Sequence, residues 1–297
     1  MRIGIDFGGT KIEAAALDAT GAFAARIREP NPGDYDAAVA LVADLIARVE
    51  AETGPARSVG LAIPGSPSPR TGLIRNANST YLNGRHLAED LQAALGRPVR
   101  LANDANCLAL SEAVDGAGVG AASVFGVILG TGCGGGLVID GKLVEGAHGV
   151  AAEIGHFSLP WPSADEAPGP VCWCGLNGCL ETWVSGSGFQ RDHAATSGRA
   201  WQAQAVIEAA RQGDAGAAAA LDRYVDRLGR ALAMVVNLVD PEVFVLGGGM
   251  SNVAELYGRL PPVVSRYVFS DHWDGRIVPA RWGDSSGVRG AARLWPD

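Results

Sequence analysis

The chain has 297 residues, of which 47% are hydrophobic and 19% charged, the composition of a globular protein with room for two domains and a substantial core. Its formal net charge of −8, without a cluster of Lys and Arg, argues against nucleic acid and anionic membranes as partners. The longest apolar stretch, residues 231–239, is far shorter than the ~20 residues of a membrane span.

The first predicted elements are two strands joined by a glycine turn. Residues 3–5 are apolar, residues 6–11 read Asp-Phe-Gly-Gly-Thr-Lys, and residues 11–17 form a second strand-like run before a turn at 18–21. This pattern predicts a β-hairpin with a glycine-rich tip. Backbone without side chains lets N–H groups converge on phosphate oxygens, so the tip is a candidate phosphate site.

Helices and strands then alternate, which predicts a largely parallel sheet. Asp34 is a candidate cap for a helix with one apolar face, formed by Ala38, Leu41, Val42, Leu45, Ile46 and Val49. The elements expected after it are a strand at 59–63 that runs into Pro64 and Gly65, a turn-rich segment at 76–84, a helix at 86–95, a strand at 99–102 and a helix at 103–114.

A second hairpin follows a glycine-rich stretch at residues 115–120, which marks a hinge. Strand-like residues 127–129 and 137–139 flank a glycine turn at 130–136. Gly130, Gly132 and Gly135 satisfy G-x-G-x-x-G, but a dinucleotide site requires a helix at that loop, and here a strand is expected. The P-loop pattern does not occur. Two such hairpins about 120 residues apart indicate an internal duplication.

The remaining predicted elements complete a second domain and return to the first. They are a Pro- and Cys-rich insert at 160–179, a long Ala-rich helix at 215–239, a strand at 243–246 that ends in a third glycine turn, and a short helix at 285–295. Two glycine turns would hold a polyphosphate and the third its nucleoside. We expect one domain at residues 1–116 plus 285–297 and a larger one at residues 117–284.

Asp104 is the candidate catalytic residue. It stands at the start of a predicted helix, where the helix dipole and free N–H groups favour a carboxylate. Such a carboxylate can accept a hydroxyl proton in phosphoryl transfer. The alternative is that Asp104 or Asn103 simply caps the helix. The three glycine turns favour the catalytic interpretation.

One histidine and three cysteines form a candidate metal site. His156, Cys172, Cys174 and Cys179 would make a closed tetrahedral shell, the composition of structural zinc. The alternative is buried free cysteines beside an unrelated histidine. Cys107 and Cys133 lie outside this cluster and are expected to pack as small apolar residues. Cysteine usage of this kind, with a glycine turn too close to residue 1 for a signal peptide, predicts a cytoplasmic protein.

Four further charged residues are candidate ligand contacts. Glu153 lies three residues before His156, on one face of a predicted helical turn, and Glu181 follows the cysteines. Both acids could accept hydrogen bonds from a polyhydroxylated ligand or could be solvated. Lys11 could contact a phosphate oxygen or be solvated, and Asp6 could anchor Mg²⁺ through water.

Taken together, these motifs resemble the ROK family of sugar kinases. That resemblance implies the two-domain α/β, actin-like (hexokinase-type, ribonuclease H-like) ATPase fold with a central cleft. It covers nearly the whole chain and rests on residues 4–11, 101–106, 128–136, 153–156, 172–181 and 246–250.

The resemblance also implies residue roles, a cofactor set and a homodimer. Asp104 would be the base, and Gly65, Asn78, Asn103, Asp104, Glu153, His156 and Glu181 would bind the sugar. His156, Cys172, Cys174 and Cys179 would bind structural Zn²⁺. ATP, with Mg²⁺, would be bound by Asp6, Gly8, Gly9, Thr10, Lys11, Gly130, Thr131, Gly132, Gly134, Gly135, Gly247, Gly248 and Gly249.

Within the family, residues 76–80, 82–84 and 283–292 are most similar to bacterial fructokinases of the manno(fructo)kinase type. The expected reaction is therefore ATP-dependent phosphorylation of fructose to fructose 6-phosphate. The alternatives are an N-acetylglucosamine, mannose or glucose kinase of the same family. A sugar-sensing regulator without kinase activity is disfavoured because the phosphate turn begins at Asp6 and the charge is acidic. A zinc-stabilised binding module is disfavoured by the intact Asp104 and glycine turns.

Overall fold

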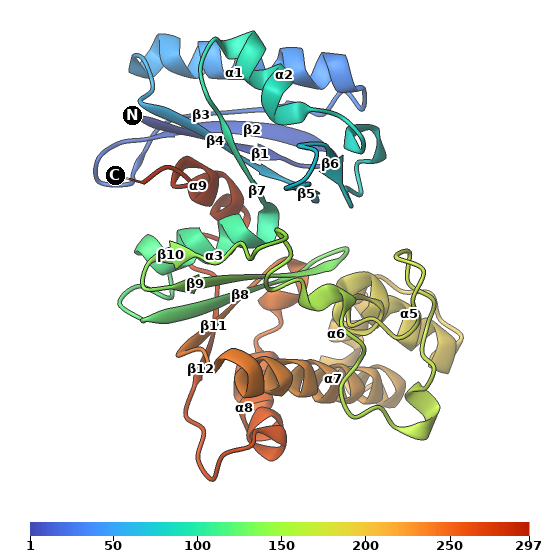
Figure 1. Ribbon diagram of the computed structural model, residues 1–297. Helices are drawn as coiled ribbons and strands as arrows, with labels where there is room; N and C mark the ends of the chain where they lie inside the picture. Colours follow the sequence, from blue (N-terminus) through green and yellow to red (C-terminus); the bar gives the residue numbers. More distant parts are fainter. Residues whose placement is uncertain (297) are drawn as a thin grey trace. The chain divides into compact units, whose positions relative to one another are not determined.

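The computed structural model describes residues 1–296 and contains two five-stranded sheets and a two-stranded one (Figure 1). Its contacts divide the chain into two compact units, Met1–Gly120 with Gly136–Ala151 and Asp284–Asp297, and Ala121–Gly135 with Ala152–Gly283. The predicted domains, 1–116 plus 285–297 and 117–284, stay a prediction. Residues 136–151, which the sequence placed in the second domain, fall in the first unit in this division.

The sheet of the first unit has the strand order β3-β2-β1-β4-β7. Strand β1 pairs antiparallel with β2, with Phe7 opposite Ile12, which confirms the first predicted hairpin. Strands β1, β4 and β7 are parallel, so their carboxyl ends meet at one edge. The bounds are Arg2–Phe7 (β1), Lys11–Leu17 (β2), Phe23–Pro30 (β3), Ser58–Ile63 (β4) and Arg100–Asn103 (β7).

Among the described residues of this unit there are four α-helices, and Figure 1 shows α1 and α2 over one face of the sheet and α9 on the other. The side chain of Asp34 accepts the N–H of Ala37, as expected for the predicted cap. The apolar face of α1 packs on the sheet and forms the core with it. The bounds are Tyr35–Thr53 (α1), Leu87–Leu95 (α2), Asp104–Asp115 (α3) and Ser286–Ala292 (α9), with short segments Ser66–Pro67 (β5), Ile74–Arg75 (β6) and Thr80–Leu82 (η1).

The backbone of helix α9 packs directly against the backbone of the sheet. A Cβ built on Gly4 of β1 would overlap the carbonyl oxygen of Val288, and one on Gly60 of β4 would overlap that of Ala291. Gly290 faces α3 just as closely, against the carbonyl of Cys107. Only glycine permits this approach, so these positions fix how deeply α9 sits in the first unit.

The second sheet has the strand order β10-β9-β8-β11-β12. Strands β8, β11 and β12 are parallel, and β9 pairs antiparallel with β10. Residues 136–139 of β9 belong to the first unit in this division. Gly136 lies against the carbonyl of Ala105, where a Cβ would not fit. The bounds are Ser123–Leu129 (β8), Cys133–Ile139 (β9), Lys142–Leu143 (β10), Val243–Gly247 (β11) and Arg276–Pro279 (β12).

Helices make up a large part of the second unit. The predicted long helix is α7, which begins after the cap Asp214 and ends at Asp240, whose φ of 42° stops it before Pro241. The α-helices are Glu181–Val184 (α4), Gly186–Ser197 (α5), Ala203–Arg211 (α6), Ala215–Val239 (α7) and Glu255–Tyr267 (α8). Short helical turns are Ile154–His156 (η2), Ala164–Glu166 (η3) and Gly249–Asn252 (η4), and Gly283–Ser285 (η5) leads from the second unit into the first.

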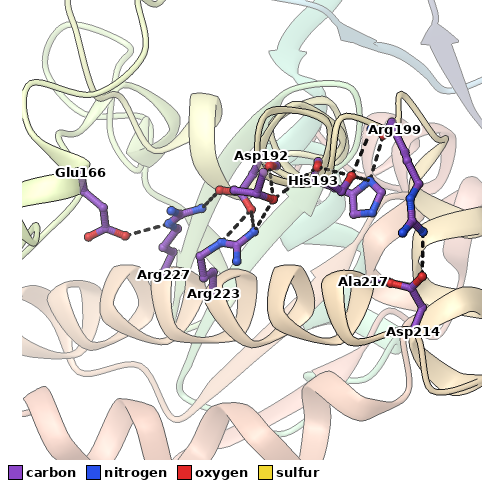
Figure 2. A network of polar contacts seen from close by, with 10 residues as sticks. Glu166, Asp192, His193, Arg199, Asp214, Ala217, Arg223 and Arg227 are labelled. Atoms are coloured by element: carbon purple, nitrogen blue, oxygen red, sulfur yellow. Dashed lines mark hydrogen bonds and ion pairs between the residues drawn. The ribbon is translucent and has the colours of Figure 1, made fainter.

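A network of ion pairs anchors the Pro- and Cys-rich insert to α7 (Figure 2). Glu166 accepts hydrogen bonds from Arg227 at 2.8 Å and from Arg230 at 2.9 Å. Arg227 also donates to Asp192 of α5 at 2.7 Å, and Arg223 donates to the same carboxylate. Both Arg227 and Arg230 are buried, so their charges depend on these partners. Within residues 1–296, none of the helices has the length and apolar character that crossing a membrane requires.

Candidate functional site

Asp104 is the first residue of α3, directly after the carboxyl end of β7. The helix cap is Asn103, whose Oδ1 accepts the N–H of Ala105 at 2.9 Å. The same N–H lies 2.8 Å from Oδ1 of Asp104. Burial raises the pKa of Asp104, and the hydrogen bonds from Ala105 and Asn103 oppose that rise. A buried carboxylate with a raised pKa is a stronger base than an exposed one.

Asp6 places a second carboxyl group in the same region, near the end of β1. Its pKa is raised from 3.8 to about 7, mainly by burial and then by the charge of Asp104, against smaller lowering effects from Lys11 and Arg28. A Cβ on Gly287 of α9 would lie 3.1 Å from its Oδ2, so the helix leaves room only for the carboxyl group. Each of these two carboxyl groups disfavours ionisation of the other, because both negative charges would lie close together. A bound cation would offset that repulsion, so the pair fits a cation site.

The first glycine turn is held by residues that the sequence pattern did not reveal. Asn31 Nδ2 donates to the carbonyl of Gly8 at 2.7 Å, and Tyr81 Oη donates to Asn31 Oδ1 at 2.8 Å. A Cβ on Gly9 would lie 3.8 Å from Oγ of Ser79. The turn therefore lies beside residues 79–81. Asn31 stands in a Pro-Asn-Pro-Gly turn, a local signal that does not indicate this long-range contact.

The structure brings Gly65, the segment around Asn78, and Asn103 together. Gly65 has φ of 74°, and a Cβ there would overlap the carbonyl of Arg75. Its own carbonyl accepts from Nδ2 of Asn103 at 3.3 Å. Ala77 exchanges two 2.9 Å hydrogen bonds with the side chain of Asn83, which fixes the loop and leaves Asn78 exposed. These candidate sugar contacts thus share one edge of the first sheet with Asp104.

The second glycine turn is shorter than the sequence predicted. Strand β9 begins at Cys133, so Gly134 and Gly135 lie in the strand and only residues 130–132 form the turn. Gly135 instead permits close packing, since a Cβ there would overlap the carbonyl of Ala152. The turn is bound on both sides: Gly186 N–H donates to the carbonyl of Gly130 at 2.7 Å, and Cys133 N–H donates to Glu181 Oε2 at 3.0 Å.

A cavity of about 1270 Å³ in the second unit joins the second and third turns. Gly130 and Thr131 line it on one side and Gly249 on another. Gly248 has φ of 80°, and a Cβ there would lie 2.6 Å from the carbonyl carbon of Leu129, so the third turn packs directly on β8. Helices α5 and α6 contribute Ser187, Gln190, Gln204, Glu208 and Arg211 to the lining, together with the α6 cap Gln202.

The four candidate metal ligands converge. The ligand atoms of His156, Cys172, Cys174 and Cys179 all lie within 4.8 Å of one another. Cys172 Sγ is 3.7 Å from His156 Nδ1, and Cys174 Sγ is 3.6 Å from Cys179 Sγ. Four ligands at zinc bond lengths stand roughly 3.5 to 3.8 Å apart, so the donor set and its spacing fit tetrahedral zinc.

Glu153 precedes a 3₁₀ turn, Ile154–His156, and His156 is the last residue of that turn, in place of the α-helical turn expected. The turn is pressed against the start of β9, because a Cβ on Gly155 would overlap the carbonyl of Cys133. Burial raises the pKa of the Cys133 thiol to about 12, with the charges of Glu181 and Glu153 adding to the effect. The predicted ligand contacts Glu153, His156 and Glu181 therefore surround the start of β9.

Comparisons with known proteins agree with this arrangement. The family model described as "ROK family" matches residues 2–297. The chain is 42% identical over 299 residues to N-acetyl-D-glucosamine kinase of Aliivibrio salmonicida (strain LFI1238), and the alignment covers 99% of each chain. It is also 42% identical over 301 residues to N-acetylgalactosamine kinase AgaK of Shewanella sp. (strain ANA-3), covering 99% of this chain and 96% of the relative.

Solved structures support the expected two-domain, actin-like (hexokinase-type) α/β fold. The ROK hexokinase from Thermus thermophilus has a TM-score of 0.87 at 33% identity, covering 98% of this chain and 96% of that one. A ROK family glucokinase from Streptomyces griseus, in complex with glucose and AMPPNP, has a TM-score of 0.80 at 31% identity, covering 99% and 98%.

The expectation of a fructokinase was wrong. Relatives about 40% identical over the full length are named as kinases of N-acetylglucosamine and N-acetylgalactosamine. The segments used for that expectation have general structural roles: residues 76–84 form the loop clamped by Asn83, and residues 286–292 form the helix packed on the first sheet. Fixing a loop and packing a helix do not by themselves distinguish one sugar from another. The match of the family model to residues 2–297 shows that the chain belongs to the ROK family.

Proposed function

We propose that this protein is an ATP-dependent kinase of N-acetylated hexosamines, with N-acetylglucosamine as its main substrate. The observation that carries the proposal is 42% identity over 99% of the chain to an N-acetyl-D-glucosamine kinase. The related N-acetylgalactosamine kinase, at the same identity, supports an acetamido sugar as the substrate class. The buried acid at the start of α3 and the glycine-lined cavity of the second unit support its assignment to phosphoryl transfer.

Asp104 acts as the general base. A hydroxyl of the sugar, expected to be the 6-hydroxyl, attacks the γ-phosphorus of ATP while its proton passes to the Asp104 carboxylate. The bond between the γ-phosphorus and the bridging oxygen breaks, and ADP leaves with that oxygen. Burial at the start of α3 raises the pKa of Asp104, which makes it a better proton acceptor.

The donor nucleotide occupies the cavity of the second unit. Its volume of about 1270 Å³ accommodates a nucleoside triphosphate, and the backbone of Gly130 and Thr131 can face phosphate oxygens. The buried carboxyl group of Asp6, whose pKa is raised to about 7, fits a site for a hydrated cation. Mg²⁺, when bound with ATP, offsets negative charge on the β- and γ-phosphates.

Structural zinc is proposed at His156, Cys172, Cys174 and Cys179. Three thiolates and an imidazole leave no open coordination position, so the metal would stabilise the loop and would not activate water. Its position, next to Glu153 and Glu181, would orient the two acids proposed to contact the sugar. The homodimer that the resemblance implies stays a prediction, which size-exclusion chromatography with light scattering can test. The cytoplasmic location also stays a prediction.

A sugar panel tests the function. Purified protein is assayed for ADP release with ATP and N-acetylglucosamine, N-acetylgalactosamine, mannose or glucose, and kcat/KM is compared. We expect N-acetylglucosamine to be highest. A higher value for glucose or mannose would reject an acetamido sugar as the main substrate. ADP release that no sugar stimulates, from protein that still binds N-acetylglucosamine, would instead identify a sugar-sensing regulator.

A further inference from the structure

Trp173 is a large aromatic residue that the reaction outlined above does not use. It lies between the metal ligands Cys172 and Cys174, and 63% of its surface is exposed. Despite that exposure it makes two specific contacts. Its ring meets the His156 ring edge to face, with centroids 5.0 Å apart and planes at 86°. Its Nε1 donates to Oε1 of Glu181 at 2.7 Å.

Glu181 continues this set of contacts to the second glycine turn. Its other oxygen, Oε2, accepts the N–H of Cys133, the first residue of β9, at 3.0 Å. A Cβ on Gly132 would lie 2.5 Å from the same oxygen, so the carboxylate lies directly against the turn. One carboxylate oxygen thus accepts from an indole N–H and the other from a backbone N–H. Together these two hydrogen bonds fix the orientation of the Glu181 carboxylate plane.

We propose that Trp173 is a positioning residue that couples the metal loop to the glycine turn at residues 130–132 through Glu181. The metal ligands hold Trp173, Trp173 holds Glu181, and Glu181 holds the N–H at the start of β9. The same turn lines the nucleotide cavity through Gly130 and Thr131. The state of the metal loop therefore alters how firmly the turn is held, in addition to any effect on the sugar.

The assignment of the turn to ATP rests on the proposed function, but the coupling itself does not. It concerns contacts within the second unit, and its readout requires neither sugar nor turnover. Hydrogen exchange at the Cys133 amide reports directly on the hydrogen bond to Glu181. If the wild-type protein has no kinase activity, the proposed function is rejected, but the exchange measurement still tests the coupling.

The test compares two substitutions in the same loop. Trp173→Phe keeps an aromatic ring for His156 and removes only the N–H donor to Glu181. Leu176→Ala is the matched control, because Leu176 is also 63% exposed and its side chain makes none of these contacts. Zinc content is measured in both variants, so that an effect of lost metal is separated from an effect of the lost hydrogen bond.

We expect Trp173→Phe to retain zinc and to speed Cys133 exchange roughly threefold to tenfold, which is the effect of one lost hydrogen bond of ordinary net strength at an exposed side chain. Leu176→Ala should leave the rate within about twofold of wild type. Removing zinc with a chelator should speed Cys133 exchange in the wild type. It should add little in Trp173→Phe, because the hydrogen bond from residue 173 to Glu181 is already lost. Unchanged exchange in Trp173→Phe, or fully additive effects of the substitution and chelation, would overturn the proposal.

Discussion

Asn103 and Gly65 are joined by a hydrogen bond from the side-chain amide of the first to the carbonyl of the second, at 3.3 Å. The same side chain caps α3 by accepting the N–H of Ala105 at 2.9 Å. Asn103 thus connects the turn after β4 to the helix start that carries Asp104. Both halves of its amide are engaged, and the two roles can be separated by mutation.

Asn103→Ser should separate them, because serine can cap the helix but cannot reach the Gly65 carbonyl. We expect unfolding stability within about 0.5 kcal/mol of wild type and a kcat lowered about tenfold through misplacement of Asp104. Asn103→Ala should lose about 1 kcal/mol more, the usual effect of a missing cap. Thermal unfolding and steady-state kinetics on the two variants check both parts. A kcat for Asn103→Ser equal to wild type would show that the Gly65 contact is dispensable.

Asp104→Asn should lower kcat by at least about 10³-fold, because the sugar hydroxyl then has no proton acceptor. Folding should be intact or slightly improved, since burial disfavours the ionised acid and the amide carries no charge. Asp44→Asn, at an exposed position of α1, serves as the control and should retain full activity. Retention of more than a tenth of wild-type kcat by Asp104→Asn would exclude Asp104 as the base.

Asp6 should make stability depend on pH. Its pKa is about 7 in the folded protein and 3.8 when unperturbed, so the folded state binds the proton more tightly. The favourable contribution is complete below pH 3.8 and is lost as the pH rises through 7. Asp6→Asn should therefore raise the melting temperature at pH 8, by the equivalent of about 1 kcal/mol or more, with a difference that shrinks toward pH 4. Calorimetry without Mg²⁺ measures this, and a gain that is constant with pH would contradict it.

Glu166→Ala should strongly destabilise the second unit. Burial alone would raise the pKa of Glu166, but hydrogen bonds from Arg230 and Arg227 lower it to about 2. Its contribution to stability is therefore present above its ordinary pKa and is lost as the pH falls toward 2. Removing the acid leaves two buried guanidinium groups without this partner, at a cost of about 3 kcal/mol. Denaturant unfolding at pH 7 checks the loss, and Arg48→Ala on the exposed face of α1 is the control.

Chelation of zinc should weaken sugar binding before it unfolds the protein. The metal ligands hold the loop at residues 172–179, whereas Glu166 and its arginine partners hold the preceding part of the insert to α7. We expect at least a tenfold rise in KM for the sugar with helical circular dichroism unchanged. Metal analysis should find close to one equivalent of zinc in the untreated protein. Less than about half an equivalent, from preparations without chelator, would count against the four-ligand site.

Local signals were sufficient to predict the elements around the glycine turns. Alternation of strand and turn residues predicted the first hairpin, a cap and an apolar face predicted α1, and the Asp-Pro pair predicted the end of α7. The convergence of the four candidate metal ligands was also predictable, because three of them are close in sequence. These features depend on short-range geometry, which the order of residues carries directly.

The sequence could not reveal features that depend on tertiary packing. Helix α8 contains Pro261 and Pro262, which ordinarily end a helix, and it persists because Leu256, Leu260 and Val264 are buried. The contact of Trp173 with Glu181 has no local signal, since nothing in the spacing places an indole on that carboxylate. The sugar was misassigned for the same reason: substituents are read by side chains brought together from separate elements.

The close seat of α9 has a consequence for how the protein is made. The backbone of residues 288–291 packs on Gly4 and Gly60, where any side chain on those two strand positions would overlap the helix. The strands of the first sheet are complete at residue 103, whereas this helix begins at residue 286. During translation, the sheet face that the helix covers therefore stays open until residues 286–292 have been made. During that interval the apolar sheet face is exposed to aggregation, and docking of the helix ends the exposure.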